Sequence, residues 1–131
     1  MPVTDKPTPL EGSHAQILQT LQTYLDAIYD GDVAALRSTF HPDAHLFAEV
    51  RGEIVQKTLA AYLQAVGERE SPAARNAPYG MSILSVEVLG KIASAKVRVQ
   101  LGENNYYNFL SLLKIGCDWL IVNKLYSHLE P

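Results

Sequence analysis

Two histidines and an aspartate lie at alternate positions in the segment TFHPDAHLF, residues 39–47. His41, Asp43 and His45 carry imidazole and carboxylate groups, which can bind a metal ion or act as general acids and bases. A metal site commonly needs three or four converging ligands, and no other cluster of Cys, His or Glu completes such a shell. We therefore expect neither a metal site nor a cofactor.

The same segment also fits a purely structural role. Pro42 cannot continue a helix, so we expect it to end one, with Asp43 bonding its own backbone and Ala44 starting a strand. This interpretation makes the segment mainly a turn. It leaves one catalytic alternative open, because His45 or Asp43 could act as a base if its side chain pointed into a cavity.

Helices are expected in the first half of the chain. Ser13 and Gln16 form a capping box at the start of a helix that we expect to end at Gly31. Its apolar stripe has helical spacing and consists of Ile17, Leu18, Leu21, Tyr24, Leu25 and Ile28. A short second helix is expected over residues 33–40, a strand over 44–55, and a third helix that begins near residue 57 and ends at Gly67.

The second half changes to strand periodicity. Segments of about ten residues at 81–90, 91–102, 105–116 and 118–129 are separated by glycine-containing turns. Ala95, Val97, Val99 and Leu101 alternate with the polar residues of the second segment, which predicts a sheet with one buried face. Helices grouped before an antiparallel meander predict an α+β fold.

Length and composition limit the possible functions. The 131 residues, 47% hydrophobic and 19% charged, fit a single domain over residues 13–131 with a flexible N-terminal lead over 1–12. The net charge of −3, with scattered basic residues, argues against nucleic acid. No apolar run reaches the roughly 18 residues that span a bilayer, so we expect no membrane partner and a cytoplasmic location. Cys117 is the single cysteine, which excludes an internal disulfide.

Two longer segments resemble a known family. TYLDAIYDGDVAALRSTFHPDAHL resembles the opening helices and strand entry of the nuclear transport factor 2-like family, and YYNFLSLLKIGCDWLIVNKLY resembles its last hairpin. In that hairpin a tryptophan follows the turn and an I-V-N-K run follows the tryptophan. The resemblance covers about residues 13–127 and extends to the family's lumazine-binding group and its SnoaL-like polyketide cyclase group. It implies three helices packed on a curved mixed or antiparallel sheet, with a pocket at the open mouth of the resulting cone.

The resemblance also allows a comparison with the ketosteroid isomerases, which share this fold. Alignment places Tyr24 on their tyrosine donor, but it places Ala48 on their catalytic base. Their second acid falls near Leu110 or Ser111, where there is no carboxylate. Two of three catalytic groups are missing, so we do not expect this activity. Tyr24 could bond a core partner or point its hydroxyl at a ligand.

Aromatic and polar residues at pocket-like positions suggest a ligand with a planar ring. The candidate ligand-binding residues are Tyr24, Phe40, Phe47, Tyr62, Tyr79, Met81 and Asn108. The leading hypothesis is a homodimeric small-molecule-binding domain without a complete catalytic set. The alternative is a small isomerase, dehydratase or cyclase that uses His45, Asp43 and Tyr24 in acid–base chemistry, and an interaction module without ligand is a third possibility.

Overall fold

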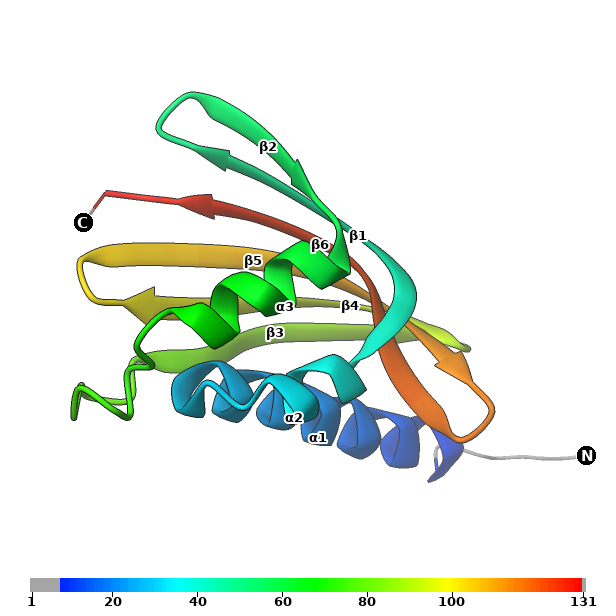
Figure 1. The fold of residues 1–131 in the computed structure, drawn as a ribbon. Helices are drawn as coiled ribbons and strands as arrows, with labels where there is room; N and C mark the ends of the chain where they lie inside the picture. The colour runs from blue at the N-terminus through cyan, green and yellow to red at the C-terminus, as the bar shows by residue number, and fades with distance from the viewer. Residues whose placement is uncertain (1–7, 131) are drawn as a thin grey trace, which may run out of the picture.

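The computed structural model describes the backbone of residues 8–130 and the side chains of residues 13–130 (Figure 1). Its helices are α1 (Thr8–Asp30), α2 (Val33–Ser38) and α3 (Leu59–Glu68). Its strands are β1 (Phe40–Val50), β2 (Glu53–Lys57), β3 (Met81–Leu89), β4 (Ile92–Leu101), β5 (Asn104–Ile115) and β6 (Asp118–His128). None of the described helices is long and apolar enough to cross a bilayer.

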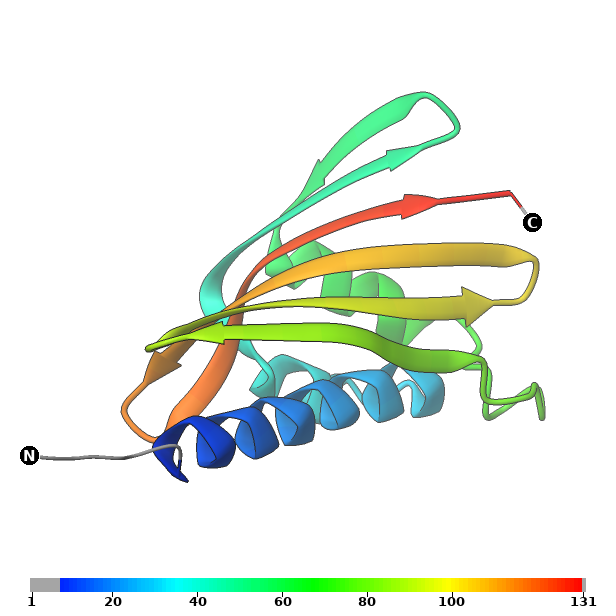
Figure 2. The ribbon, with the colours of Figure 1, turned by 180° about the vertical axis from the view of Figure 1, so that it is seen from behind.

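The strands form one six-stranded sheet in the order β2-β1-β6-β5-β4-β3. All neighbouring strands are antiparallel except β1 and β6, which are parallel. The sheet curves, and the helices lie on its concave side, so that the whole resembles an open cone (Figures 1 and 2). The expected α+β class and the four-strand meander are therefore confirmed.

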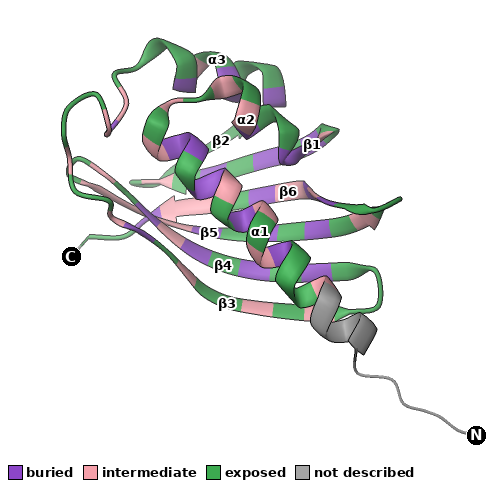
Figure 3. Cartoon of the chain, turned by 90° about the horizontal axis from the view of Figure 1, so that it is seen from below, coloured by how far each residue is buried: buried purple, intermediate pink, exposed green. Residues whose placement is uncertain are grey.

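The core lies between α1 and the concave face of the sheet. Ile17, Leu21, Tyr24 and Leu25 are at most 1% exposed and come from one side of α1, which forms a buried stripe over the sheet (Figure 3). Burial of each such side chain stabilises the fold by about 1.5–3 kcal/mol. The expected alternation in β4 is confirmed, since Ala95, Val97 and Val99 are buried and Lys96 is exposed.

The ends of the first two helices differ from expectation. Helix α1 begins at Thr8, so Ser13 lies inside the helix and not at its N-cap. The helix can begin early because Pro9 occupies its first turn, where proline is tolerated. The proposed flexible lead over residues 1–12 therefore overlaps α1, while residues 1–7 lie outside the described residues. Helix α2 ends at Ser38, before the expected Phe40.

The segment HPDA, residues 41–44, is an irregularity within a strand, not a turn before one. Phe40 pairs with Ile121 and His45 pairs with Asn123, so four residues of β1 bulge out opposite a single residue of β6. Inside this bulge the Asp43 amide donates a 3.0 Å hydrogen bond to His41 Nδ1, in place of the expected Asx turn. Proline fits this bulge because it has no backbone N–H, and a residue in a bulge need not donate one to the neighbouring strand.

Candidate functional site

A cavity of about 100 Å³ opens between α3 and the concave face of the sheet, at the wide end of the cone. We call it the α3 cavity. Apolar residues of α1 and β4 form its floor, and its polar lining consists of Lys57, Tyr62, Arg69, Tyr106, Asn108, Lys124 and Tyr126. No acidic residue lines it. Its volume is below the ~300–1,000 Å³ typical of drug-sized sites, so it suits one ring or a similarly small group.

Lys124 is the most unusual residue of the α3 cavity. It is only 4% exposed, whereas lysines are almost never fully buried without a partner. Its Nζ lies 3.9 Å from the centroid of the Tyr62 ring, 4.8 Å from Tyr126 and 5.4 Å from Tyr24. Within the described part of the chain, no carboxylate lies within 4.0 Å of this amine. Lys124 is therefore a buried amine surrounded by tyrosine rings.

A β-bulge turns Lys124 toward the inside of the cone. Ser111 of β5 pairs with Asn123, but Leu112 pairs with Ile121, so Val122 is an extra residue in β6. Side chains alternate between the two faces of a strand, and one inserted residue reverses this alternation. Before the bulge Ile121 is buried, and after it Lys124 is buried while Leu125 is exposed. Without the bulge the strand would place Lys124 on the outer face.

The surroundings of Lys124 favour its neutral form. Burial is the main cause that lowers the pKa of this amine well below its usual value, and the nearby charges of Arg69 and Lys57 lower it further. Contact with the tyrosine rings acts in the opposite direction, but cation–π contacts contribute only about 0.5–2 kcal/mol. Full burial alone can shift a pKa by up to ~3–5 units, at about 1.4 kcal/mol per unit. Desolvation is the larger effect.

The tyrosine hydroxyls around the amine keep their protons. Burial raises the pKa of Tyr24 and Tyr62, and also that of Tyr126, above the ordinary value of 10.0. These hydroxyls are therefore neutral donors near physiological pH. The inner wall of the α3 cavity thus combines a poorly protonated amine with neutral phenols, while the positive charges of Lys57 and Arg69 lie on more exposed side chains.

Asn108 supplies an unused acceptor to the same cavity. Its side chain is 2% exposed, and its Nδ2 donates a 2.8 Å hydrogen bond to the Tyr24 hydroxyl. Its Oδ1 is buried and has no hydrogen-bond partner among the described residues. An unpaired buried acceptor costs about 1–3 kcal/mol, and such a group requires an explanation. A donor on a bound ligand would provide one.

The expected ligand-binding residues divide into two sets. Tyr62 and Asn108 line the α3 cavity. Tyr24 and Phe40 lie directly behind them, since the Phe40 ring centroid is 5.9 Å from those of both Tyr24 and Tyr62. Tyr24 is 0% exposed, and its hydroxyl bonds Asn108, which is the core-partner alternative considered from the sequence.

Three other expected residues lie elsewhere. Phe47 is exposed on the outer face of the sheet, where it pairs with Leu125, because it alternates with the buried Leu46. Tyr79 lies before β3 and donates a 2.8 Å hydrogen bond to Asp26, and burial raises its pKa to about 12. Met81 belongs to the hydrophobic core.

The expected acid–base set is not assembled. His45 and Asp43 are exposed on β1, whereas Tyr24 is fully buried beneath the cavity. The condition for a base at His45, an inward side chain, is not met, because strand alternation places the neighbouring Leu46 inside. Among the described residues, no cluster of three His, Cys, Asp or Glu side chains could hold a metal ion.

None of the three basic residues of the α3 cavity was predicted from the sequence. Lys124 is the lysine of the I-V-N-K run, which contributed only to the resemblance. Strict alternation in DWLIVNKLY assigns it to the outer face, since nothing in the residue types marks the bulge at Val122. Lys57 and Arg69 lie at the ends of β2 and α3, where the sequence offered no signal for a shared cavity.

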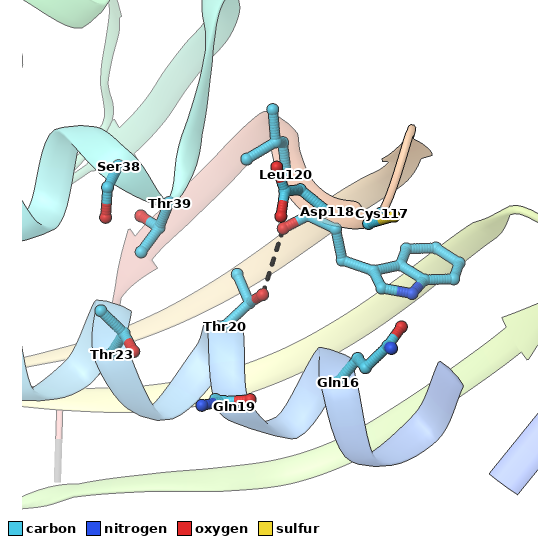
Figure 4. A pocket seen from close by; sticks show the side chains of 10 residues that line it. Gln16, Gln19, Thr20, Thr23, Ser38, Thr39, Cys117, Asp118 and Leu120 are labelled. Carbon is cyan, nitrogen blue, oxygen red and sulfur yellow. Dashed lines mark hydrogen bonds between the residues drawn. The ribbon is translucent and has the colours of Figure 1, made fainter. Parts of the chain in front are cut away.

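A second, wider groove of about 560 Å³ lies at the other end of α1 (Figure 4). Uncharged polar side chains of α1, including Gln16 and Thr20, face the β5–β6 turn across it. Thr20 Oγ1 donates a 3.1 Å hydrogen bond to the Trp119 carbonyl, which ties the helix to the hairpin. This groove lacks the buried amine of the α3 cavity and has a single aromatic residue, Trp119, in its lining, so the α3 cavity is the candidate site.

Comparison with known proteins identifies related sequences and folds. Residues 12–127 match the family described as "Putative lumazine-binding". The chain is 23% identical over 110 residues to the aldolase FrzH of a Cladobotryum species, a match that covers 84% of this chain and 86% of that protein.

Solved structures share the fold. An NTF2-like protein of unknown function from Silicibacter pomeroyi superposes with a TM-score of 0.77 at 24% identity, covering 92% of this chain and 98% of the other. An NTF2-like protein of unknown function from Shewanella baltica gives a TM-score of 0.80 at 20% identity, with coverage of 92% and 96%.

Proposed function

The chain belongs to the NTF2-like superfamily and to its family described as "Putative lumazine-binding", and we propose that the α3 cavity binds a small organic anion with a flat ring. The charge of the lining carries this proposal. Lys57 and Arg69 contribute two positively charged side chains, Lys124 adds an amine whose surroundings favour its neutral form, and no acidic side chain lines the cavity. The faces of Tyr62 and Tyr126 would contact the ring, and the acceptor Asn108 Oδ1 would fix its orientation.

The size of the α3 cavity sets how much of the ligand it encloses. A dry cavity of about 150 Å³ can enclose a benzene molecule. The α3 cavity, at about 100 Å³, is smaller, so at most one ring would enter and the charged substituent would remain at the mouth, near Lys57 and Arg69. A larger heterocycle such as a lumazine would extend beyond the mouth.

Binding of para-hydroxymethylbenzoate and of its uncharged methyl ester tests this proposal by calorimetry and thermal shift. The acid should bind and raise the melting temperature, because a ligand of the folded state stabilises it. The ester should bind more weakly, because it lacks the charge. Arg69→Gln should weaken binding of the acid several-fold, whereas Arg37→Gln, at an exposed position in the last turn of α2, should not. Equal affinity for acid and ester would contradict the proposed charge recognition.

Enzymatic turnover is a second candidate function, favoured by two observations. The Cladobotryum relative is named an aldolase, and the α3 cavity contains a buried amine whose pKa is lowered. Turnover through His45, Asp43 and Tyr24 has no such support, because His45 and Asp43 are exposed on β1 whereas Tyr24 is buried in the core.

We also infer that the protein is a homodimer that associates through the outer face of the sheet. Phe47, Leu125 and Phe109 pair across neighbouring strands on this face, and each is at least 37% exposed. Leu84 and Leu129 continue the same apolar surface. A second copy would cover it.

A further inference from the structure

We propose that Lys124 Nζ is a nucleophile that forms an imine with a small aldehyde or ketone bearing an anionic group. This inference rests on the proposed function of the α3 cavity and adds a covalent step to it. The carbonyl group would enter the cavity toward Lys124, while the anionic group would stay near Lys57 and Arg69.

The environment of Lys124 differs from that of a structural lysine. A structural lysine normally pairs with a carboxylate or extends its amine to water. Lys124 is 4% exposed, no described carboxylate is within 4.0 Å, and the α3 cavity it lines contains no acid. The bulge at Val122 turns this side chain inward, although the regular strand would have exposed it. Bulges occur frequently next to active sites, where they re-aim a side chain.

The charges around the amine support nucleophilic reactivity. A lysine is activated when it is desolvated or lies near another cation, since only the neutral amine has a free electron pair. Burial and the charges of Arg69 and Lys57 both lower the pKa of Lys124. The other ionisable groups facing it are tyrosine hydroxyls from α1, α3, β5 and β6, namely Tyr24, Tyr62, Tyr106 and Tyr126.

The proposed reaction is a condensation without oxidation or reduction. The nitrogen electron pair of Lys124 attacks the carbonyl carbon, and one proton of the amine passes to the carbonyl oxygen to give a carbinolamine. The carbon–oxygen bond then breaks, and the hydroxyl leaves as water with the second proton of the amine. One amine and one carbonyl group thus yield one imine and one water molecule, with protons relayed by water or a tyrosine hydroxyl.

Asn108 fits the intermediate. It pairs with Tyr126 across β5 and β6, while Lys124 is two residues away on β6, so Asn108 and Lys124 are diagonal neighbours on the concave face. Asn108 lines the same cavity, and its Oδ1 has no hydrogen-bond partner among the described residues. The carbinolamine hydroxyl is a donor, and Asn108 Oδ1 would accept its proton in a hydrogen bond.

Reductive trapping tests the proposal directly. The full-length protein is incubated near neutral pH with para-formylbenzoate and cyanoborohydride, which reduces an imine to a stable secondary amine, and peptide mass spectrometry locates the adduct. We expect Lys124 to carry at least about tenfold more adduct than Lys91, which is exposed in the β3–β4 turn, since each unit of lowered pKa increases the neutral fraction about tenfold. Raising the pH should reduce this preference, because ordinary lysine amines lose their protons at high pH as well. Equal labelling of Lys124 and Lys91 at neutral pH would overturn the proposal.

Variants and analogues complete the test. Lys124→Met, an apolar side chain of similar length, should abolish the dominant adduct, while Lys91→Met should not. Benzaldehyde, which lacks the charge, should label Lys124 more slowly than para-formylbenzoate. If Lys124→Met fails to fold, the ratio of Lys124 to Lys91 labelling in the unmodified protein still decides the proposal.

The alcohol para-hydroxymethylbenzoate separates this inference from the proposed function, because it has the same charge and ring but cannot form an imine. Binding of the alcohol without trapping of the aldehyde at Lys124 would refute the imine and leave the binding function standing. If the alcohol does not bind and the aldehyde is not trapped, both proposals fail.

Discussion

Asn108 on β5 donates a 2.8 Å hydrogen bond to the hydroxyl of Tyr24 on α1, and this bond joins the helix to the sheet beneath the α3 cavity. Both residues are almost fully buried, at 2% and 0% exposure. The bond also fixes the orientation of the Asn108 amide, because its Nδ2 is engaged and its Oδ1 is directed elsewhere. The Tyr24 hydroxyl thus orients Asn108, which lines the cavity, whereas Tyr24 itself is not among the lining residues.

Tyr24→Phe should destabilise the protein by about 1–3 kcal/mol, because it leaves the buried Nδ2 of Asn108 without its partner. Chemical denaturation measures this loss. Tyr107→Phe is the matched control, since no hydrogen bond of the Tyr107 hydroxyl occurs among the described residues and its removal should change stability little. Unchanged stability of Tyr24→Phe would indicate that water replaces the lost hydroxyl and that the wall of the cavity is wet.

Lys124→Met should stabilise the protein near neutral pH by about 1 kcal/mol or more, because it removes the cost of an amine that titrates in a buried site. The sign follows from proton binding. Between the lowered pKa of the folded chain and the ordinary value of 10.5, the unfolded chain binds more protons, so wild-type stability rises with pH. The stabilising effect of the substitution should therefore shrink as the pH approaches about 10.

Urea denaturation of the wild type and Lys124→Met, at neutral pH and near pH ~10, measures this difference. The raised pKa values of the tyrosines affect stability at the alkaline end in both proteins, so they largely cancel in the comparison. Lys91→Met, at an exposed position, is the matched control for the loss of a lysine. A pH-independent difference between wild type and Lys124→Met would mean that the amine titrates normally.

Gly31→Ala should cost more stability than Gly116→Ala. Both glycines have positive φ, +71° and +62°, where a side chain costs roughly 1–2 kcal/mol. A Cβ on Gly31 would also lie 3.0 Å from the Cβ of Ser71, whereas nothing lies within 4 Å at Gly116. Thermal denaturation of the two variants isolates the effect of the contact with Ser71. Equal decreases in melting temperature would show that the loop around Ser71 shifts at little cost to make room for the new Cβ.

The architecture followed from the sequence because its signals are local. The apolar stripe of α1, from Ile17 to Ile28, and the alternation in β4 report which faces are buried, and the glycines at 90, 102 and 116 mark the three hairpin turns. The lumazine-binding resemblance, confirmed by the family match over residues 12–127, correctly placed the strands on a cone. These features require no knowledge of distant contacts.

The lining of the cavity was only partly predictable because it depends on register. Tyr62 follows from the period of α3, but Lys124 lies inside only because Val122 is unpaired. Phe47 was predicted to bind the ligand because it is aromatic. It follows the buried Leu46 directly, so its side chain lies on the opposite, outer face of the sheet. An inserted residue, or a shift of one position along the strand, moves a side chain to the opposite face of the sheet. Residue types alone determine neither the bulge nor the face.

Phe109→Glu on the outer face should convert the proposed dimer to a monomer. Phe109 is 54% exposed, and its Cα partners are Lys96 on β4 and Leu125 on β6, so it lies at the centre of the apolar surface. A carboxylate buried at such an interface without a partner costs several kcal/mol. Sedimentation at micromolar concentration measures the change, and Ala60→Glu, on the exposed side of α3, adds the same charge away from the surface. A wild-type protein that sediments as a monomer would refute the dimer, and a Phe109→Glu variant that remains dimeric would place the interface elsewhere.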